Sequence, residues 1–114
     1  MKDKKVVIIT GAGRGIGAAT ARLFAKKDYA VCINYKTNSI TANALAKAIN
    51  DEGGHCITVQ ADVSKEEDVN RLFITVDQEL GKLSILVNNA GILKKQSRLE
   101  NMTAERINSI LINN

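Results

Sequence analysis

The sequence has no proline and no tryptophan, and aromatic residues make up only 4% of its 114 residues. The absence of proline excludes a proline-rich linker, and the scarcity of aromatic rings argues against a nucleic-acid surface built on base stacking. Histidine occurs once, as His55, and cysteine twice, as Cys32 and Cys56, each within an apolar run. These numbers are too small for a disulfide framework or a zinc centre, so we expect two buried free thiols and no metal site.

Long apolar segments are missing as well. No run approaches the roughly 20 residues of a membrane span. The first apolar run is too short for a signal peptide, because it soon ends in a glycine-rich loop. Lysine and arginine number 16 against 12 aspartates and glutamates, a mild and dispersed excess. We therefore expect a cytoplasmic protein with no membrane or nucleic-acid partner, whose charge still suits anionic ligands such as phosphates.

The composition, 45% hydrophobic and 25% charged, is that of a globular domain. Apolar runs rich in β-branched residues alternate with segments of helical periodicity. The expected strands are residues 5–10, 30–35, 55–60 and 83–88, and the expected helices are residues 15–27, 39–52, 64–80 and a last one from Thr103. Because the strand runs are almost continuously apolar, they predict an α/β fold, with a parallel sheet covered by helices on both faces.

Three of these helices carry more detailed expectations. The first helix is expected to bury the face that carries Ile16, Ala19, Leu23 and Phe24. The residues Ser64–Glu67 have the pattern of a capping box, in which Ser64 would cap the third helix. The last helix is expected to carry its apolar residues on one side, at Ile107, Ile110 and Leu111.

The strongest chemical signal is the loop Thr10–Gly17, which has four glycines in eight residues directly after the first strand. Glycines allow a sharp turn and a close approach of the backbone to a ligand. The following helix directs its free N–H groups and the positive end of its dipole at the same place. The loop therefore predicts a phosphate or pyrophosphate at residues 11–16.

Other nucleotide-binding patterns fit this loop less well. A Walker A loop needs lysine and then serine or threonine after its last glycine, but Ala18 and Ala19 follow Gly17. The pattern G-x-G-x-x-G gives only a weak match, from Gly13 to Ala18. A methyltransferase that binds S-adenosylmethionine would use an acid after the second strand for the ribose, and the residues there, Asn34-Tyr35-Lys36, include none.

Three elements together identify a family resemblance: Thr10-Gly11 with Gly15 and Gly17, then Asp62-Val63, then Asn88-Asn89-Ala90-Gly91. In this order and spacing the sequence resembles the short-chain dehydrogenase/reductase family. The resemblance covers the whole chain, but only the first half of a typical member. It implies a Rossmann-type doubly wound sheet in strand order 3-2-1-4. It also implies hydride transfer between NADP(H) and a carbonyl or alcohol, and the substrate, such as a 3-oxoacyl thioester or a sugar, is left open.

The resemblance assigns cofactor contacts to individual residues. The loop would hold the pyrophosphate and the adenosine ribose with Thr10, Gly11, Arg14, Gly15, Ile16 and Gly17. Asp62 would accept a hydrogen bond from the adenine amino group, and Val63 would pack on the ring. The nicotinamide ribose would lie against Asn89, Ala90 and Gly91, whereas Asn88 is expected to be structural.

Charge predicts the form of the cofactor. NAD offers a ribose hydroxyl that suits a carboxylate, but no acid lies between Ala30 and Ser39. Arg14 in the loop and Lys36 after the second strand would instead meet the 2′-phosphate of NADP, with Tyr35 beside the ribose. The sequence therefore predicts NADP, with NAD as the less favoured cofactor.

The catalytic tyrosine and lysine of the family are absent from these residues. Tyr29 and Tyr35 are followed four positions later by Ile33 and Ser39, so neither begins Tyr-x-x-x-Lys, and packing beside the second strand is the expected role of both. Asn114 aligns with the asparagine of the family's proton relay, with Asn113 as the alternative.

We therefore expect residues 1–114 to be the NADP-binding half of one domain whose catalytic half, with the Ser and the Tyr-x-x-x-Lys, is missing. Without that half, the fourth strand would lie at an open edge of the sheet. The resemblance also implies a homodimer or homotetramer for the full-length protein. The alternative is a stand-alone nucleotide-binding module, or pseudo-enzyme, without catalysis.

Overall fold

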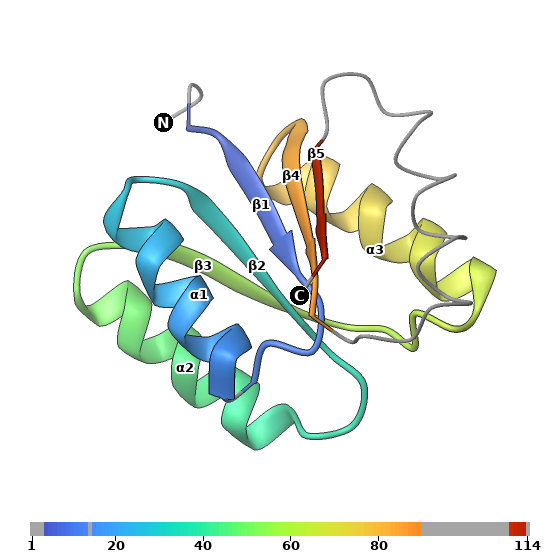
Figure 1. Ribbon diagram of the computed structural model, residues 1–114, viewed down its shortest axis with the longest axis horizontal. Coiled ribbons are helices and arrows are strands. Elements are labelled where there is room, and N and C mark those ends of the chain that lie inside the picture. The colour runs from blue at the N-terminus through green and yellow to red at the C-terminus, as the bar shows by residue number, and fades with distance from the viewer. Residues whose placement is uncertain (1–3, 14, 90–109, 114) are drawn as a thin grey trace.

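The computed structural model describes residues 4–13, 15–89 and 110–113, and the described part is an α/β sheet with three helices (Figure 1). The elements follow one another as β1 (Val6–Ile9), α1 (Gly15–Lys26), β2 (Ala30–Tyr35), α2 (Ser39–Asp51), β3 (His55–Gln60), α3 (Glu66–Glu79), β4 (Leu83–Asn88) and β5 (Ile110–Asn113). The predicted α/β class is confirmed, and the bounds of β2, β3 and β4 are those expected from the sequence.

The five strands form one parallel sheet in the order β3-β2-β1-β4-β5. The expected order 3-2-1-4 is therefore confirmed, with one strand added. Figure 1 shows α1 and α2 together on one face of the sheet and α3 on the other. This is the doubly wound arrangement of a Rossmann-type fold, in which ligands bind at the carboxyl ends of the strands.

The central strand β1 shows why its sequence is apolar throughout. Val6 and Ile8 contribute to the core beneath α3, and Val7 and Ile9 to the core beneath α1 and α2. All four side chains are at most 1% exposed. A strand covered on both faces needs apolar residues at every position, because neither face meets water.

The prediction of a helix through Ile110 and Leu111 is wrong. Residues Ile110–Asn113 form β5, which pairs in parallel with β4 from Ile85 to Asn88. Consequently β4 does not lie at an open edge of the sheet. Three consecutive apolar residues with branched side chains suit a strand, and pairing satisfies the backbone groups that β4 would otherwise expose. The start of the expected helix, at residues 103–109, lies outside the described residues.

The buried face of α1 also differs from the prediction. Ile16 and Leu23 are 69% and 55% exposed, and Ala19 is exposed as well. Of the four residues predicted to be buried, Phe24 packs partly buried against the core, and the fully buried residues of the helix are Gly17 and Ala21. Small residues let a helix axis approach a sheet closely, and here this contact outweighed the spacing of the large apolar residues.

Candidate cofactor site

The predicted site residues that the structure describes gather at the carboxyl ends of β1 to β4. Thr10 fixes the start of the glycine loop against the end of β4, and it is fully buried. Its backbone N–H donates to the Val87 carbonyl at 3.0 Å, and its hydroxyl donates to Asn88 Oδ1 at 3.1 Å. The same hydroxyl oxygen accepts the backbone N–H of Asn89 at 2.9 Å. A threonine at this position therefore joins two segments that are far apart in the sequence.

A second connection runs from Asn89 back to the loop. The Asn89 side-chain amide donates to the Gly11 carbonyl at 3.0 Å. Gly17 lies directly beside this bond, since a Cβ on it would meet Asn89 Nδ2 at 2.6 Å and Ala12 Cα at 2.8 Å. Only glycine fits there, so the close packing of the first turn of α1 against the loop depends on the absence of a side chain.

The expected structural role of Asn88 is confirmed. Its side chain is 1% exposed, and its oxygen accepts the Thr10 hydroxyl. Its Nδ2 atom is buried and has no hydrogen-bond partner in the described part of the chain. Asn88 also pairs in register with Asn113 of β5, which was the alternative to Asn114 for the relay asparagine.

A hollow of about 170 Å³ opens where the glycine loop meets the end of β2. It is lined by Gly11, Gly13, Tyr35, Lys36, Thr37, Asn38 and Thr41. The first turn of α2 contributes to it, and Asn38 caps that helix by accepting the Thr41 N–H at 3.2 Å. No side chain of this lining is acidic, so the hollow combines one cation, several neutral polar groups and the positive end of a helix dipole. A larger hollow, of about 330 Å³, lies elsewhere, among Arg22, Ala25, Lys26, Asp28, Ile49, Glu52, Gly53 and Gly54.

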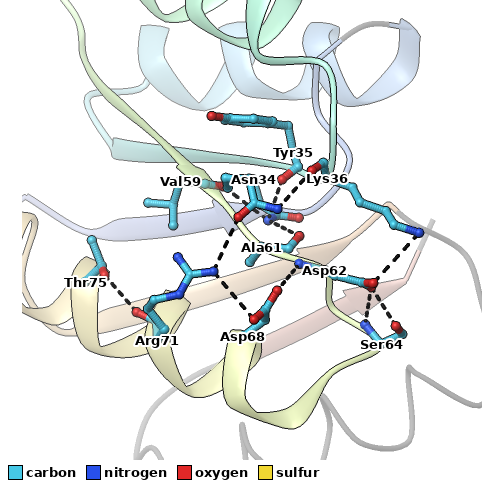
Figure 2. A network of polar contacts seen from close by, with 11 residues as sticks. Asn34, Tyr35, Lys36, Val59, Ala61, Asp62, Ser64, Asp68, Arg71 and Thr75 are labelled. Carbon is cyan, nitrogen blue, oxygen red and sulfur yellow. Dashed lines mark hydrogen bonds and ion pairs between the residues drawn. The ribbon is translucent and has the colours of Figure 1, made fainter.

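Asp62 follows β3 and lies beside Lys36, one of the residues that line this hollow (Figure 2). Its Oδ1 accepts both the backbone N–H of Ser64, at 2.9 Å, and the Ser64 hydroxyl, at 2.6 Å. Its Oδ2 lies 3.8 Å from Lys36 Nζ. The Asp62 side chain is 18% exposed, so the carboxylate is held in one orientation while remaining reachable.

The predicted capping box is wrong. The N-cap residue of α3 is Lys65, which makes no side-chain cap hydrogen bond, and Ser64 binds Asp62 instead. An Asx-type turn at Asp62 competes for the serine hydroxyl, which explains the difference. Val63, predicted to pack on the adenine ring, is only 8% exposed and belongs to the core beneath α3.

Sequence reasoning missed three polar residues behind this site, namely Gln60, Asp68 and Arg71. Asp68 Oδ2 accepts the backbone N–H of Asp62 at 2.8 Å, and Gln60 Nε2 donates to the Lys36 carbonyl at 3.0 Å. The Arg71 guanidinium lies 3.6 Å from Asp68 Oδ1 and 3.5 Å from Gln60 Oε1. The only signal in the sequence was an acid in the first turn of a helix, which usually indicates no more than a favourable charge there.

Four predicted site residues lie outside the described residues: Arg14, Ala90, Gly91 and Asn114. Of the two tyrosines, Tyr29 packs edge-on against Phe24, with ring centroids 4.8 Å apart. Tyr35 is half-buried and lines the hollow beside Lys36. Gly15 adopts a positive φ of 65° at the start of α1, and the adjacent Ile16 is exposed beside the loop.

The two thiols are free and buried, as predicted. Cys32 faces the core beneath α3 and Cys56 the core beneath α1 and α2, so they lie on opposite faces of the sheet. Burial raises the pKa of Cys56 to about 12 and that of Cys32 further still. Within the described ranges, no three His, Cys, Asp or Glu side chains come together as metal ligands. No helix in the described part of the chain is long and apolar enough to cross a bilayer.

A parallel sheet with a glycine loop between β1 and α1 defines a Rossmann-type domain. Comparison with known families refines this assignment, because the family model described as short chain dehydrogenase matches residues 5–114. The chain belongs to the short-chain dehydrogenase/reductase family, whose members bind a nicotinamide cofactor.

Individual relatives agree with this assignment. The chain is 45% identical over 109 residues to the uncharacterized oxidoreductase YgfF of Escherichia coli (strain K12), covering 96% of this chain and 44% of the relative. It is 36% identical over 101 residues to glucose 1-dehydrogenase 2 of Bacillus subtilis (strain 168), covering 89% of this chain and 39% of the relative. The chain therefore spans less than half the length of these relatives.

Solved structures show the same fold. A short-chain dehydrogenase/reductase from Serratia marcescens BCRC 10948 superposes with a TM-score of 0.73 at 34% identity, over 77% of this chain and 36% of that one. A candidate D-mannonate oxidoreductase from Haemophilus influenza, with bound NAD, superposes with a TM-score of 0.69 at 26% identity. That match covers 73% of this chain and 29% of the other.

Proposed function

We propose that this chain is the cofactor-binding half of an NADP-dependent oxidoreductase that transfers a hydride between NADP(H) and a small carbonyl or alcohol substrate. The observation that carries the proposal is the lining of the hollow at the end of β2. This lining includes Lys36 and contains no acidic side chain. The relative named as an oxidoreductase and the relative named as a glucose 1-dehydrogenase favour this function over a stand-alone binding module.

The pyrophosphate would bind at the glycine loop. The backbone turns at Gly11 and Gly15, which have φ angles of 61° and 65°, and α1 begins at the second of them. The unpaired N–H groups of the first helical turn are good donors to phosphate oxygens. Asn89 would hold the loop in this shape. The hydrogen bond from its side-chain amide to the Gly11 carbonyl engages the carbonyl side of the loop, which leaves the N–H side for the ligand.

The adenosine would extend from the loop over the ends of β2 and β3. Asp62 Oδ2 would accept a hydrogen bond from the adenine amino group, since Oδ1 already accepts two hydrogen bonds from Ser64. The 2′-phosphate would enter the hollow beside Lys36, where Thr37 offers a hydroxyl donor and the Thr41 hydroxyl could exchange its 3.4 Å hydrogen bond to the Asn38 carbonyl for one to the phosphate. Arg14 would add a second cation from the loop.

The chemical step would need residues beyond this half. We propose that the full-length protein supplies the Ser and the Tyr-x-x-x-Lys after Asn114, with Asn114 in the proton relay beside the nicotinamide. The tyrosine would protonate the carbonyl oxygen as the reduced nicotinamide gives its hydride to the carbonyl carbon. A 3-oxoacyl thioester or a sugar would suit this reaction, and we propose a cytoplasmic homodimer or homotetramer as the working form.

The test is the affinity of the full-length protein for both cofactors. A charge-assisted hydrogen bond to phosphate contributes about 1.5–3 kcal/mol, so we expect NADPH to bind about ten- to a hundredfold more tightly than NADH. Tyr35→Asp should reverse this preference, because a carboxylate in the hollow repels the 2′-phosphate and accepts the ribose hydroxyl of NADH. Isothermal titration of both cofactors with both proteins gives the four dissociation constants.

Tyr35→Asn serves as the control, because it removes the same ring without adding a charge and should leave NADPH preferred. Added salt should weaken the preference, since Lys36 is 66% exposed and its charge is screened. A wild-type preference for NADH, or an equal loss of both cofactors in Tyr35→Asp, would contradict NADP dependence while leaving family membership intact.

A further inference from the structure

The polar network behind the adenosine end joins β3 and α3 to the residues that would touch the cofactor (Figure 2). We propose that Asp68 is a positioning residue for adenine recognition, which acts by fixing the backbone of Asp62. This inference deepens the proposed function and rests on its assignment of Asp62 to the adenine amino group. The family resemblance assigned no role to Asp68.

A hydrogen bond joins the two residues directly. Asp68 Oδ2 accepts the backbone N–H of Asp62 at 2.8 Å, a length typical of a strong bond to an ionised acceptor. The Asp68 side chain is 20% exposed, so solvent weakens this bond less than it would on an open surface. The bond holds the chain where β3 has ended and α3 has not begun, one residue after Ala61, whose N–H still donates to the Tyr35 carbonyl of β2 at 2.9 Å.

The direction of the Asp62 carboxylate depends on its neighbours on both sides. With its backbone held by Asp68 and its Oδ1 held by Ser64, the carboxylate has little freedom to rotate. Its Oδ2 then remains directed toward Lys36 and the hollow at the end of β2. The Asp62 carbonyl also accepts the Lys65 N–H at 2.9 Å, so loss of the Asp68 bond would loosen the backbone on its N–H side. The carboxylate would then be presented less uniformly.

The network also reaches the 2′-phosphate end of the site. Arg71 lies between Asp68 and Gln60, and Gln60 donates to the Lys36 carbonyl at 3.0 Å. The two Arg71 contacts are long, at 3.6 and 3.5 Å, and its side chain is 49% exposed. The hydrogen bond from Asp62 to Asp68 should therefore matter more than either contact of Arg71.

A merely structural role for Asp68 would be that of any acid in the first turn of α3, where a negative charge interacts favourably with the positive end of the helix dipole. Glu67 occupies the same turn, carries the same charge and is exposed. Glu67→Ala therefore removes the same charge while leaving the bond to Asp62, and it is the matched control for Asp68→Ala. Asp68→Asn is the conservative variant, because its side-chain oxygen still accepts the Asp62 N–H.

The experiment compares binding of NADPH with binding of its hypoxanthine analogue. In that analogue a carbonyl oxygen replaces the amino group that would donate a hydrogen bond to Asp62. We expect the wild-type full-length protein to prefer NADPH by about tenfold or more, the equivalent of one charge-assisted hydrogen bond. Asp62→Ala should reduce the ratio to about one. Asp68→Ala should lose most of the ratio, whereas Asp68→Asn and Glu67→Ala should keep it.

The outcomes separate the inference from the function on which it rests. A wild-type ratio near one, or a ratio that Asp62→Ala leaves unchanged, overturns the adenine role of Asp62 and the inference with it. A ratio that collapses in Asp62→Ala but survives in Asp68→Ala overturns the inference alone. An equal collapse in Asp68→Ala and Asp68→Asn, or in Glu67→Ala, also overturns it. If Asp68→Ala fails to fold, Asp68→Leu takes its place at low temperature: the inference expects Asp68→Leu to lose the ratio that Asp68→Asn keeps, and equal ratios in the two variants overturn it.

Discussion

At the scale of single residues, the shape of the glycine loop depends on contacts that leave no space for additional atoms. Thr10 joins the loop to Asn88 and Asn89 by hydrogen bonds, and the Asn89 side chain donates a further hydrogen bond to the Gly11 carbonyl. Gly17 faces this second bond, at a distance where a methyl group would overlap the amide. The loop geometry is therefore determined by two side chains and one missing side chain.

We expect Gly17→Ala to lower both stability and cofactor affinity. The added Cβ would lie 2.6 Å from Asn89 Nδ2 and 2.8 Å from Ala12 Cα, so backbone as well as side chain must shift. Overpacking of this kind costs about 1–3 kcal/mol, and displacement of Asn89 would release the Gly11 carbonyl. Urea unfolding measures the first effect, and titration with NADPH measures the second.

Gly13→Ala is the matched control in the same loop. Its Cβ would meet the Thr41 hydroxyl oxygen at 3.0 Å, and that hydroxyl belongs to a side chain that can rotate away. We expect a change in unfolding free energy below about 1 kcal/mol. Equal destabilisation by the two variants would mean that the close approach at Gly17 does not shape the loop.

At the scale of elements, the sequence predicted the strands better than the helix faces. The runs Ala30–Tyr35, His55–Gln60 and Leu83–Asn88 form strands with those bounds, because they are continuous apolar runs that end at loop residues. For α1 the large residues Ile16 and Leu23 gave a false periodicity: Phe24 packs against the core as expected, but the fully buried positions are held by the small residues Gly17 and Ala21. β5 was missed for a different reason. It has only four residues, and it is a strand because it pairs with the otherwise open side of β4, a partner that no local sequence pattern indicates.

The buried thiols of β2 and β3 give a pH dependence that belongs to these strands. Burial raises the pKa of Cys56 to about 12, whereas an unfolded thiol ionises near 8.5–9. The folded state then holds the proton where the unfolded state has lost it, so the stability contribution is complete below about pH 8.5 and declines as pH rises toward 12. We expect the free energy of unfolding to fall by at most about 1.4 kcal/mol per pH unit for this thiol in that range. Urea unfolding at a series of pH values from 7 to about 11 checks this.

Lysine and tyrosine side chains also titrate in that range, so the comparison variant is Cys56→Ala. It should show a shallower decline than the wild type, and the difference between the two slopes isolates the thiol. Parallel slopes would indicate that Cys56 ionises in the folded state as readily as in the unfolded one.

At the scale of the whole molecule, the parallel sheet brings residues from four separate loops to one edge. β1 lies between β2 and β4, so its glycine loop meets Lys36 on one side and Asn89 on the other. This much of the site follows from the sequence, because parallel strands place all their carboxyl ends together. Gln60, Asp68 and Arg71 did not follow from it, since their role depends on the distance between α3 and the end of β3, which no spacing along the chain reveals.

The last prediction concerns the proton donor, which we expect in the half of the proposed enzyme that follows residue 114. Neither Tyr29 nor Tyr35 is suited to donate the proton. Tyr29 packs against Phe24, and Tyr35 lines the hollow at the end of β2. The substrate would lie elsewhere, beyond Asn89 at the end of β4. We therefore expect the 114-residue chain to show no carbonyl-dependent oxidation of NADPH, and the full-length protein to show it. Replacing the tyrosine of the expected downstream Tyr-x-x-x-Lys by phenylalanine should reduce kcat by at least about a hundredfold, with little change in the dissociation constant of NADPH, because the hydroxyl acts on the substrate and not on the adenosine half of the cofactor. Turnover by the 114-residue chain alone, measured as loss of NADPH absorbance with a panel of 3-oxoacyl thioesters and sugars, would instead place the proton donor among the residues described above.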